Sequence, residues 1–185
     1  MSGPRARPSG RRVVVGVSGS LASPAALRHA AVLARREDAE VLAVLAWEPP
    51  EGEALFACRP DRSWARMWGE AARTRLDRAV LDGLGPLLSG GPHPPAVARR
   101  VVRESPAAAL CAMADRPDDL LVLGARPARG RLGRLRPRPV LRAVLGRAGR
   151  PVLTVPGPAL LPGEARVLRR SADAHAPYGV RGVRI

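Results

Sequence analysis

The chain has 185 residues, with 31 basic (Lys plus Arg) and 16 acidic side chains, and its formal net charge is +15. This length suits one domain with a substantial core and argues against a second domain. The sequence contains no lysine, so arginine carries all of the basic charge. Such usage fits the coding bias of a GC-rich genome, but the excess still attracts polyanions at low salt.

No apolar run approaches the roughly 18 residues of a membrane span, and the basic amino terminus leads only into a short strand. Cys58 and Cys111 are too few and too far apart for a metal motif or a disulfide framework. We therefore expect a bacterial cytoplasmic protein with no membrane attachment, no metal and ordinary thiols. Composition predicts a disordered basic arm over 1–10, a domain over 11–157 and a disordered basic tail over 158–185.

The first half of the domain alternates strand and helix. Residues 13–17 are a buried-strand run, and Ser23 is predicted to cap a helix that has Pro24 at its first position and ends near Arg36. The continuous apolar run 41–47 is typical of a strand covered on both faces.

A long connection and a long helix follow. We expect a loop over 49–60 and an amphipathic helix over 62–81, which the glycines and proline of 83–86 bring to an end. A second loop is expected over 90–95.

The second half repeats the pattern, with Ser105-Pro106 resembling the earlier cap. The remaining predicted elements are a strand over 96–103, a helix from the cap to Asp115, a strand over 119–124, a helix over 140–148 and a strand over 151–155. Repeated strand–helix units predict an α/β fold, a flavodoxin-like open five-stranded mostly parallel sheet with helices on both faces. Such sheets bind ligands at the carboxyl ends of their strands.

Taken in order, these segments resemble the universal stress protein family over residues 11–156. The matching stretches are Val13-Val-Val-Gly-Val-Ser-Gly-Ser20, Val41-Leu-Ala-Val-Leu-Ala-Trp47, Glu104-Ser-Pro106, Asp118-Asp-Leu-Leu-Val-Leu-Gly124, Arg142-Ala-Val-Leu145 and Arg150-Pro-Val-Leu-Thr-Val155. Each match is weak alone, but their order and spacing are specific to the family.

The resemblance implies a nucleotide cleft whose motif is degenerate in this chain. In the family the first strand usually ends in an Asp that contacts the nucleotide, where this chain has Ser18. ATP-binding members carry Gly-x2-Gly-x9-Gly-Ser/Thr after the fourth strand; Gly124 matches, but the next positions fall on Pro127, Pro137 and Arg138. One inserted residue would move the last pair to Arg138 and Pro139 without restoring the motif. Proline removes the N–H donor that a phosphate cradle needs.

The positions that the resemblance assigns to nucleotide binding share the carboxyl edge of the sheet and the loop after the fourth strand. They are Val17, Ser18, Ala46, Gly124, Arg126, Gly130 and Arg138. The loop also carries Arg129, Arg131, Arg134 and Arg136. Three interpretations stay open: a nucleotide site rebuilt on arginine side chains, a lost site with an anion-binding loop, and a solvated loop that drifted.

Tryptophans near the expected cleft carry two interpretations each. Trp47 closes the sheet core or walls an adenine pocket. Trp64 and Trp68 lie one turn apart, which is usual for packing, or they belong to a lid over the cleft.

We therefore expect a non-enzymatic stress-response or regulatory module with no cofactor and no catalytic or metal-binding residues. One alternative is an ATP-binding universal stress protein with weak or slow hydrolysis. Another is a protein that associates with nucleic acid or other polyanions through Arg126–Arg138. The family resemblance also implies a homodimer through the last strand, Pro151–Val155, around Leu153.

Overall fold

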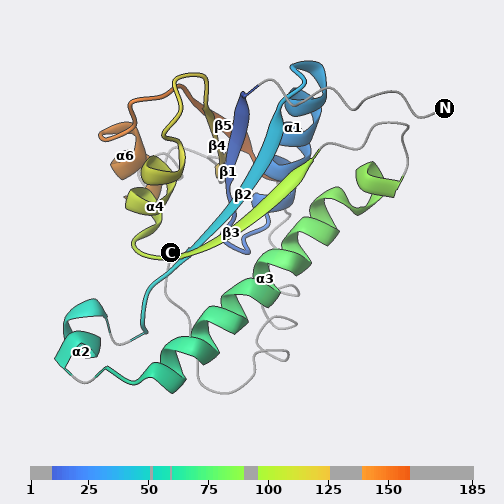
Figure 1. The fold of residues 1–185 in the computed structure, drawn as a ribbon. Helices are drawn as coiled ribbons and strands as arrows, with labels where there is room; N and C mark the ends of the chain where they lie inside the picture. Colours follow the sequence, from blue (N-terminus) through green and yellow to red (C-terminus); the bar gives the residue numbers. More distant parts are fainter. Residues whose placement is uncertain (1–9, 51, 59, 90–95, 126–138, 159–185) are drawn as a thin grey trace.

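Five parallel strands form one sheet in the order β3-β2-β1-β4-β5, which confirms the predicted fold class (Figure 1). The structure is a computed structural model, and it describes residues 10–50, 52–58, 60–89, 96–125 and 139–158. The strands are β1 (Arg12–Gly16), β2 (Glu40–Trp47), β3 (Val97–Arg103), β4 (Leu120–Ala125) and β5 (Val152–Pro156). The helices are α1 (Ser23–Arg36), α2 (Glu53–Cys58), α3 (Arg62–Ser89), α4 (Pro106–Met113) and α6 (Pro139–Leu145).

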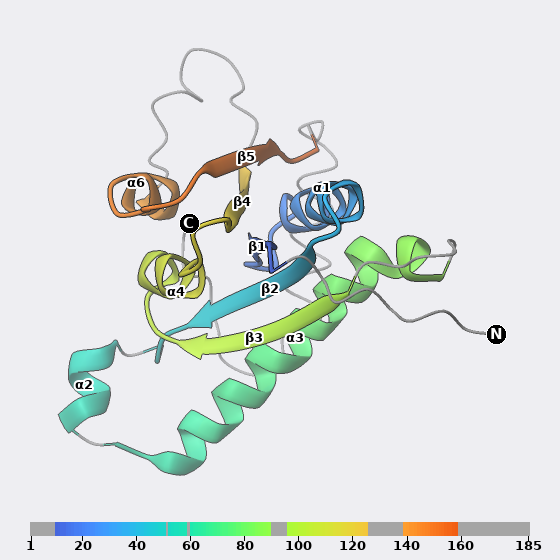
Figure 2. The same cartoon turned by 45° about the horizontal axis from the view of Figure 1, so that its top comes forward.

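Helices cover both faces of the sheet. α1 and α3 lie against one face and α4 and α6 against the other, as the two views show (Figures 1 and 2). The apolar run in β2 is buried from Val41 to Leu45, as expected of a strand covered on both sides. None of the helices in the described residues is long and apolar enough to cross a membrane.

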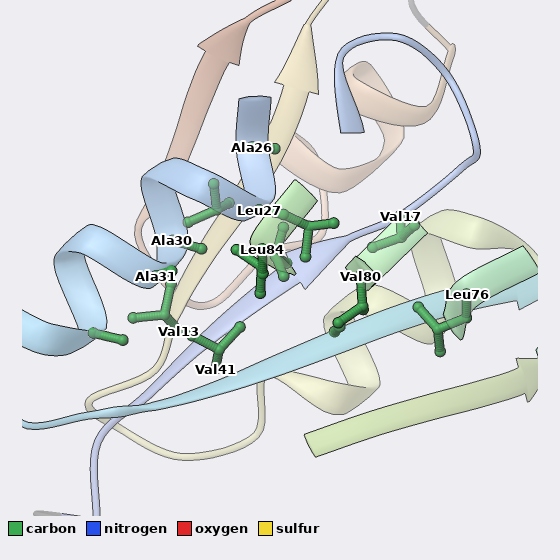
Figure 3. Packing of buried hydrophobic residues seen from close by; sticks show 14 of the residues in the cluster. Val13, Val17, Ala26, Leu27, Ala30, Ala31, Val41, Leu76, Val80 and Leu84 are labelled. Atoms are coloured by element: carbon green, nitrogen blue, oxygen red, sulfur yellow. The ribbon is translucent and has the colours of Figure 1, made fainter. Parts of the chain in front are cut away.

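The larger core lies between the sheet and the α1–α3 pair (Figure 3). Leu27 from α1 and Leu84 from α3 are both fully buried, and they lie side by side over β1 in the close view. Val80 and Leu76 continue this row along α3 toward the carboxyl ends of the strands. Burial of each such side chain contributes roughly 1.5–3 kcal/mol. The α1–α3 pair therefore supports the edge of the sheet where a ligand would bind.

α3 is longer than predicted, because it continues through the glycines and proline of 83–86 to Ser89. Packing explains why Gly83 does not end the helix. A Cβ at Gly83 would lie 3.1 Å from Leu27 Cδ1 and 3.4 Å from the Pro24 Cα atom. Gly83 is therefore the point where α3 approaches α1 closely, and tertiary packing overrides its low helix propensity.

The predicted loop over 49–60 is also partly wrong, because it contains the short helix α2. Asp61 then begins α3: its Oδ1 accepts hydrogen bonds from the N–H of Ser63 at 2.7 Å and from the Ser63 hydroxyl at 2.6 Å. The Ser63 hydroxyl is the main cause of a lowered pKa of Asp61. The other predicted boundaries differ from the observed ones by a few residues. The arm 1–9, the loop 90–95 and the tail from residue 159 lie outside the described residues.

A buried ion pair ties the amino ends of β1 and β4 together. Arg12 donates to both oxygens of Asp119, from Nε to Oδ1 at 3.1 Å and from NH2 to Oδ2 at 2.6 Å. The Asp119 side chain has no exposed surface, and that of Arg12 is 12% exposed. Arg12 also donates to the Met113 carbonyl at 3.1 Å and to Asp115. Loss of Arg12 would leave the buried carboxylate of Asp119 without an ionic partner, which is costly.

The same guanidinium gives the fold a dependence on pH. Its hydrogen bond is the main cause of a lowered pKa of Asp115. A carboxylate whose folded-state pKa is depressed stabilises the fold above its unfolded-state pKa, and this stabilisation is lost as the pH falls through the folded-state pKa. The contribution of Asp115 is therefore complete at neutral pH and disappears only below the usual range of aspartate.

Removal of the guanidinium tests this pair. Arg12→Leu should lower the free energy of unfolding by about 3–5 kcal/mol, because it leaves Asp119 buried without a partner. Arg11→Leu is the matched control, since Arg11 meets Glu37 at 3.4 Å on the surface with half-exposed side chains, and it should cost about 0–1 kcal/mol. Urea denaturation measures both values. Equal losses in the two variants would contradict a special role for Arg12.

Candidate functional site

A cluster of three serine hydroxyls organises the turn from β1 into α1. The Ser23 Oγ accepts a hydrogen bond from the Ser18 N–H at 3.1 Å and lies 3.4 Å from the Ser18 Oγ. The Ser20 Oγ lies 3.5 Å from the same Ser23 atom. Gly19 takes a φ of +74°, the left-handed conformation that allows the chain to reverse between Ser18 and Ser20. The turn therefore uses its hydroxyl groups internally.

Ser23 does not cap α1 as predicted. Ala22 occupies the cap position, and Ser23 is the first helical residue, with Pro24 following it. The Ser23 side chain is buried, and its hydroxyl turns back to Ser18 instead of forward to the helix. The buried Ser23 hydroxyl needs a partner, and the Ser18 N–H supplies one in place of a capping bond. Ser105 does occupy the cap position of α4, but without a side-chain capping bond.

Ala22 fills the space beside the two glycines that end β4 and follow β5. A Cβ placed on Gly124 would lie 2.8 Å from the Ala22 carbonyl oxygen and 2.9 Å from the Ala22 Cβ. A Cβ placed on Gly157 would lie 2.8 Å from the Ala22 Cβ. Real Cβ atoms do not come this close to other heavy atoms. Contact with the turn accounts for the absence of a side chain at both positions.

Four of the seven predicted nucleotide-binding residues are described, and they lie at the carboxyl edge of adjacent strands. Val17 is buried, and its N–H donates to the Val44 carbonyl at 2.8 Å. Ser18 follows it, Gly124 belongs to β4 and the half-buried Ala46 belongs to β2. Topology therefore brings these residues to one edge, as strand order β2-β1-β4 requires. The other predicted positions, Arg126, Gly130 and Arg138, lie outside the described residues.

An aromatic cluster lies where the carboxyl ends of β2 and β3 meet the start of α3. Trp68 is at its centre, with ring centroids 6.3 Å from Trp47, 6.1 Å from Phe56 and 5.8 Å from Trp64. This arrangement agrees with the packing interpretation of Trp47, Trp64 and Trp68. Trp64 is 52% exposed at the outer end of the cluster.

Sequence reasoning missed Arg103, which joins β3 to α2. Its guanidinium lies 4.2 Å from the centroid of the Phe56 ring and 5.8 Å from that of Trp47. It also donates to both carboxylate oxygens of Glu53, at 3.2 and 2.6 Å. The pair spans 50 residues of sequence, so no local spacing could have indicated it. Stacking and a two-point ion pair together anchor a helix that otherwise lies at the periphery (Figure 2).

The described residues contain no group of three or more His, Cys, Asp or Glu side chains arranged to hold a metal ion. Both cysteines are free thiols, Cys58 exposed and Cys111 partly buried.

Comparison with known proteins identifies the family. The model of the universal stress protein family matches residues 10–156. The chain belongs to the universal stress protein family. No curated protein matches it significantly.

Several solved structures are also similar to this chain. A hypothetical protein whose biochemical function was assigned from its structure is 14% identical, with a TM-score of 0.55 over 81% of this chain and 98% of that chain. A universal stress protein in complex with cAMP is 24% identical, with a TM-score of 0.48 over 80% and 98% of the two chains. The universal stress protein from Archaeoglobus fulgidus in complex with dAMP is 20% identical, with a TM-score of 0.45 over 78% and 97%. At these identities the likeness concerns the fold alone.

The contact with Ala22 predicts that Gly124 of this universal stress protein is needed for stability. Gly124→Ala should lower the free energy of unfolding by about 1–3 kcal/mol, because backbone atoms of the turn must move. Gly69→Ala is the control, since a Cβ on Gly69 within α3 would meet only the Trp47 side chain, at an ordinary contact distance of 3.8 Å, and it should stabilise by about 0.5–1 kcal/mol. Thermal unfolding followed by circular dichroism measures both. If Gly124→Ala does not change the stability, packing against Ala22 is not the reason for this glycine, and close approach of a ligand becomes the better explanation.

Proposed function

We propose that this universal stress protein is a non-enzymatic regulatory module of the cytoplasmic stress response whose carboxyl edge does not hold ATP. The observation that carries the proposal is the position of Ala22 against Gly124, since contact with the turn accounts for a glycine at this position without any need for a phosphate. Ser18 supports it further, because its N–H is already engaged by Ser23. A neutral hydroxyl also stands where ATP-binding members of the family place a carboxylate.

The free energy of the missing contacts is large enough to abolish ATP binding at micromolar concentration. Each charge-assisted contact to a nucleotide is worth about 1.5–3 kcal/mol. The chain lacks the carboxylate at Ser18, and the sequence places prolines at 127 and 137, where amide donors are needed. The loss of two or three contacts moves a micromolar site to roughly millimolar affinity or weaker.

Purified protein should therefore carry no nucleotide and should not bind ATP below about millimolar concentration, by the same arithmetic. Chromatography of an acid extract tests the first point, and calorimetric titration tests the second. The titration includes cAMP and dAMP, the ligands named for two structural neighbours. Stoichiometric ATP in the extract, or turnover of ATP, would favour the alternative of an ATP-binding member with slow hydrolysis.

A combined variant provides the positive control. Ser18→Asp together with Pro127→Gly, Pro137→Gly and Arg138→Ser restores the family's residues at each altered position. If the altered residues are the cause, this variant should gain ATP affinity that the parent lacks. A parent that already binds as tightly as the variant would contradict the proposal.

We also propose a homodimer through β5, the strand that the resemblance assigns to assembly. Two main-chain bonds define its orientation: Leu121 N–H donates to the Pro151 carbonyl at 3.0 Å, and Gly157 N–H donates to the Ala125 carbonyl at 2.8 Å. Because main-chain groups of a strand alternate in direction, Leu153 faces β4, whereas Val152 and Thr154 face the free edge. Thr154, which is exposed, is therefore the position at which to interrupt pairing between copies.

Thr154→Pro should convert the dimer to monomer, because it removes an outward N–H while the bonds to β4 remain. Thr154→Ala keeps that N–H and should stay dimeric. Light scattering coupled to gel filtration at tens of micromolar distinguishes the two states. Parent protein that is monomeric at this concentration would refute the dimer.

A second candidate function rests on the arginine-rich segment 126–138, where six of thirteen residues are arginine and none is acidic. Such a segment favours binding of polyanions with little sequence preference. If roughly five phosphates are neutralised, log affinity should fall with log salt at a slope near −4 to −5. Changing Arg129, Arg131, Arg134 and Arg136 together to Ser should flatten that slope and leave the melting temperature nearly unchanged. An unchanged slope would assign the binding elsewhere, and unfolding would make these arginines structural.

A further inference from the structure

β3 is an edge strand whose outer main-chain groups pair with no other strand in the described part of the chain. Its orientation follows from two bonds to β2: Val41 N–H donates to the Ala96 carbonyl at 2.9 Å, and Glu104 N–H donates to the Trp47 carbonyl at 3.1 Å. In a parallel pair, the residues that face the neighbouring strand alternate. The N–H and C=O groups of residues 97, 99, 101 and 103 therefore point away from the sheet. Such a ladder is the surface to which an extended chain adds.

A groove runs beside this edge, between β3 and α3. One part has a volume of about 250 Å³ and lies between Arg73 and Leu76 of α3 and Val97 and Val101 of β3. A second part of about 520 Å³ shares Arg73 and Val101 and extends toward the carboxyl end of β3. Both parts are lined by side chains of the residues whose main-chain groups face outward. A strand added at this edge would place its alternate side chains into the groove.

Free positive charge lines the groove on the helix side. Arg66 and Arg73 have no ion-pair partner among the described residues, and both line the larger part. Glu70 lies between them on α3 and makes no ion pair with any residue that the structure describes. Two guanidinium groups and one carboxylate leave a net positive charge, which matches an acidic ligand.

The arginines of β3 itself do not block the edge. Arg99 Nε lies 3.4 Å from the Asp77 Oδ1 of α3, and Arg103 is held by Glu53 of α2. Both guanidinium groups are therefore drawn toward the helices and away from the free main chain. Arg100 makes one long hydrogen bond, 3.4 Å, to the outward carbonyl of Arg99, which the N–H of an added strand would replace. Charged side chains commonly protect an edge strand by projecting across its free main chain. Arg99 and Arg103 do not project in this way, because each is paired with a helix.

We propose that the α3–β3 groove binds an extended acidic peptide segment of a partner protein. The segment lies along β3 as a sixth strand, bonded to the outward main-chain groups, and its carboxylates at alternate positions meet Arg66 and Arg73. The aliphatic parts of these same acidic side chains pack on Val97 and Val101. A nucleic acid would supply negative charge but not the row of amide donors and acceptors that this edge matches.

The test uses the full chain and a fluorescent peptide of alternating valine and glutamate, with binding followed by anisotropy. Arg66→Gln with Arg73→Gln should weaken binding by about tenfold or more, because two charge-assisted contacts are lost. Arg28→Gln with Arg35→Gln makes the same change of net charge on the exposed side of α1 and should have little effect. Glu70→Gln removes the competing carboxylate and should tighten binding several-fold, by about 2–5 times.

A second pair of variants tests the main-chain ladder. Arg99→Pro removes an outward N–H, whereas Arg99→Gln makes the same charge change and keeps it. Arg99→Pro should bind at least about tenfold more weakly than Arg99→Gln, with melting temperatures reported for both. A peptide methylated on alternate main-chain nitrogens makes the same test without altering the protein, and it should not bind.

Three results would overturn the proposal. The two double variants could bind equally well, which would assign the attraction to net charge alone. The methylated peptide could bind as well as the parent peptide, which would exclude strand addition. Single-stranded oligothymidylate could compete fully through Arg66 and Arg73 and bind more tightly than the peptide, which would make the groove a nucleic-acid surface.

Discussion

The contact between the β1–α1 turn and two glycines is the constraint on which the carboxyl edge of this sheet depends. Ala22 presents its carbonyl and Cβ to Gly124 and its Cβ to Gly157, at distances that exclude any side chain at either position. A single residue of the turn thereby touches the end of β4 and the segment after β5 while it starts α1. Since interiors are close-packed, a ligand that displaced the turn would disturb all three elements at once. The glycine that looks like a phosphate-binding residue in the sequence serves the packing of the fold.

The three serines of the turn, Ser18, Ser20 and Ser23, hold it together by polar contacts in addition to this packing. Ser23 is buried and accepts the Ser18 N–H, so the turn satisfies its own polar groups without a ligand. The neutral hydroxyl of Ser18 lies within the turn's own network, with the N–H of Ser20 3.4 Å from it. Hydrogen bonds among the three serines thus hold the turn together without a ligand.

Local pattern predicted the fold well and the contacts between distant segments poorly. The unbroken apolar run from Val41 to Trp47 is typical of a strand covered on both faces, and the structure buries Val41 to Leu45 in β2. Gly83 was misinterpreted because its role depends on Leu27, which lies on another helix. The pair Arg12–Asp119 spans 107 residues, so it leaves no trace in spacing or propensity. For the candidate site, strand order brings Ser18 and Gly124 to one edge, as expected. The contact of Ala22 with Gly124 could not be predicted, because it depends on how the turn packs against a distant strand.

The two edges of the sheet differ in a way that separates their uses. At β5 the outward positions are Val152 and Thr154, which are uncharged, and Pro156, which has no donor. At β3 the strand carries Arg99, Arg100 and Arg103. Two copies of β3 brought together would place arginines near arginines, and like charges on opposed strands are destabilising.

Self-pairing is therefore compatible with β5 and opposed at β3. The arginines of β3 that repel a second copy of this strand attract an acidic chain. Among the described residues the sheet thus ends in two edge strands of different chemistry, β5 and β3. The neutral edge suits an identical strand, and the basic edge suits an extended chain of opposite charge.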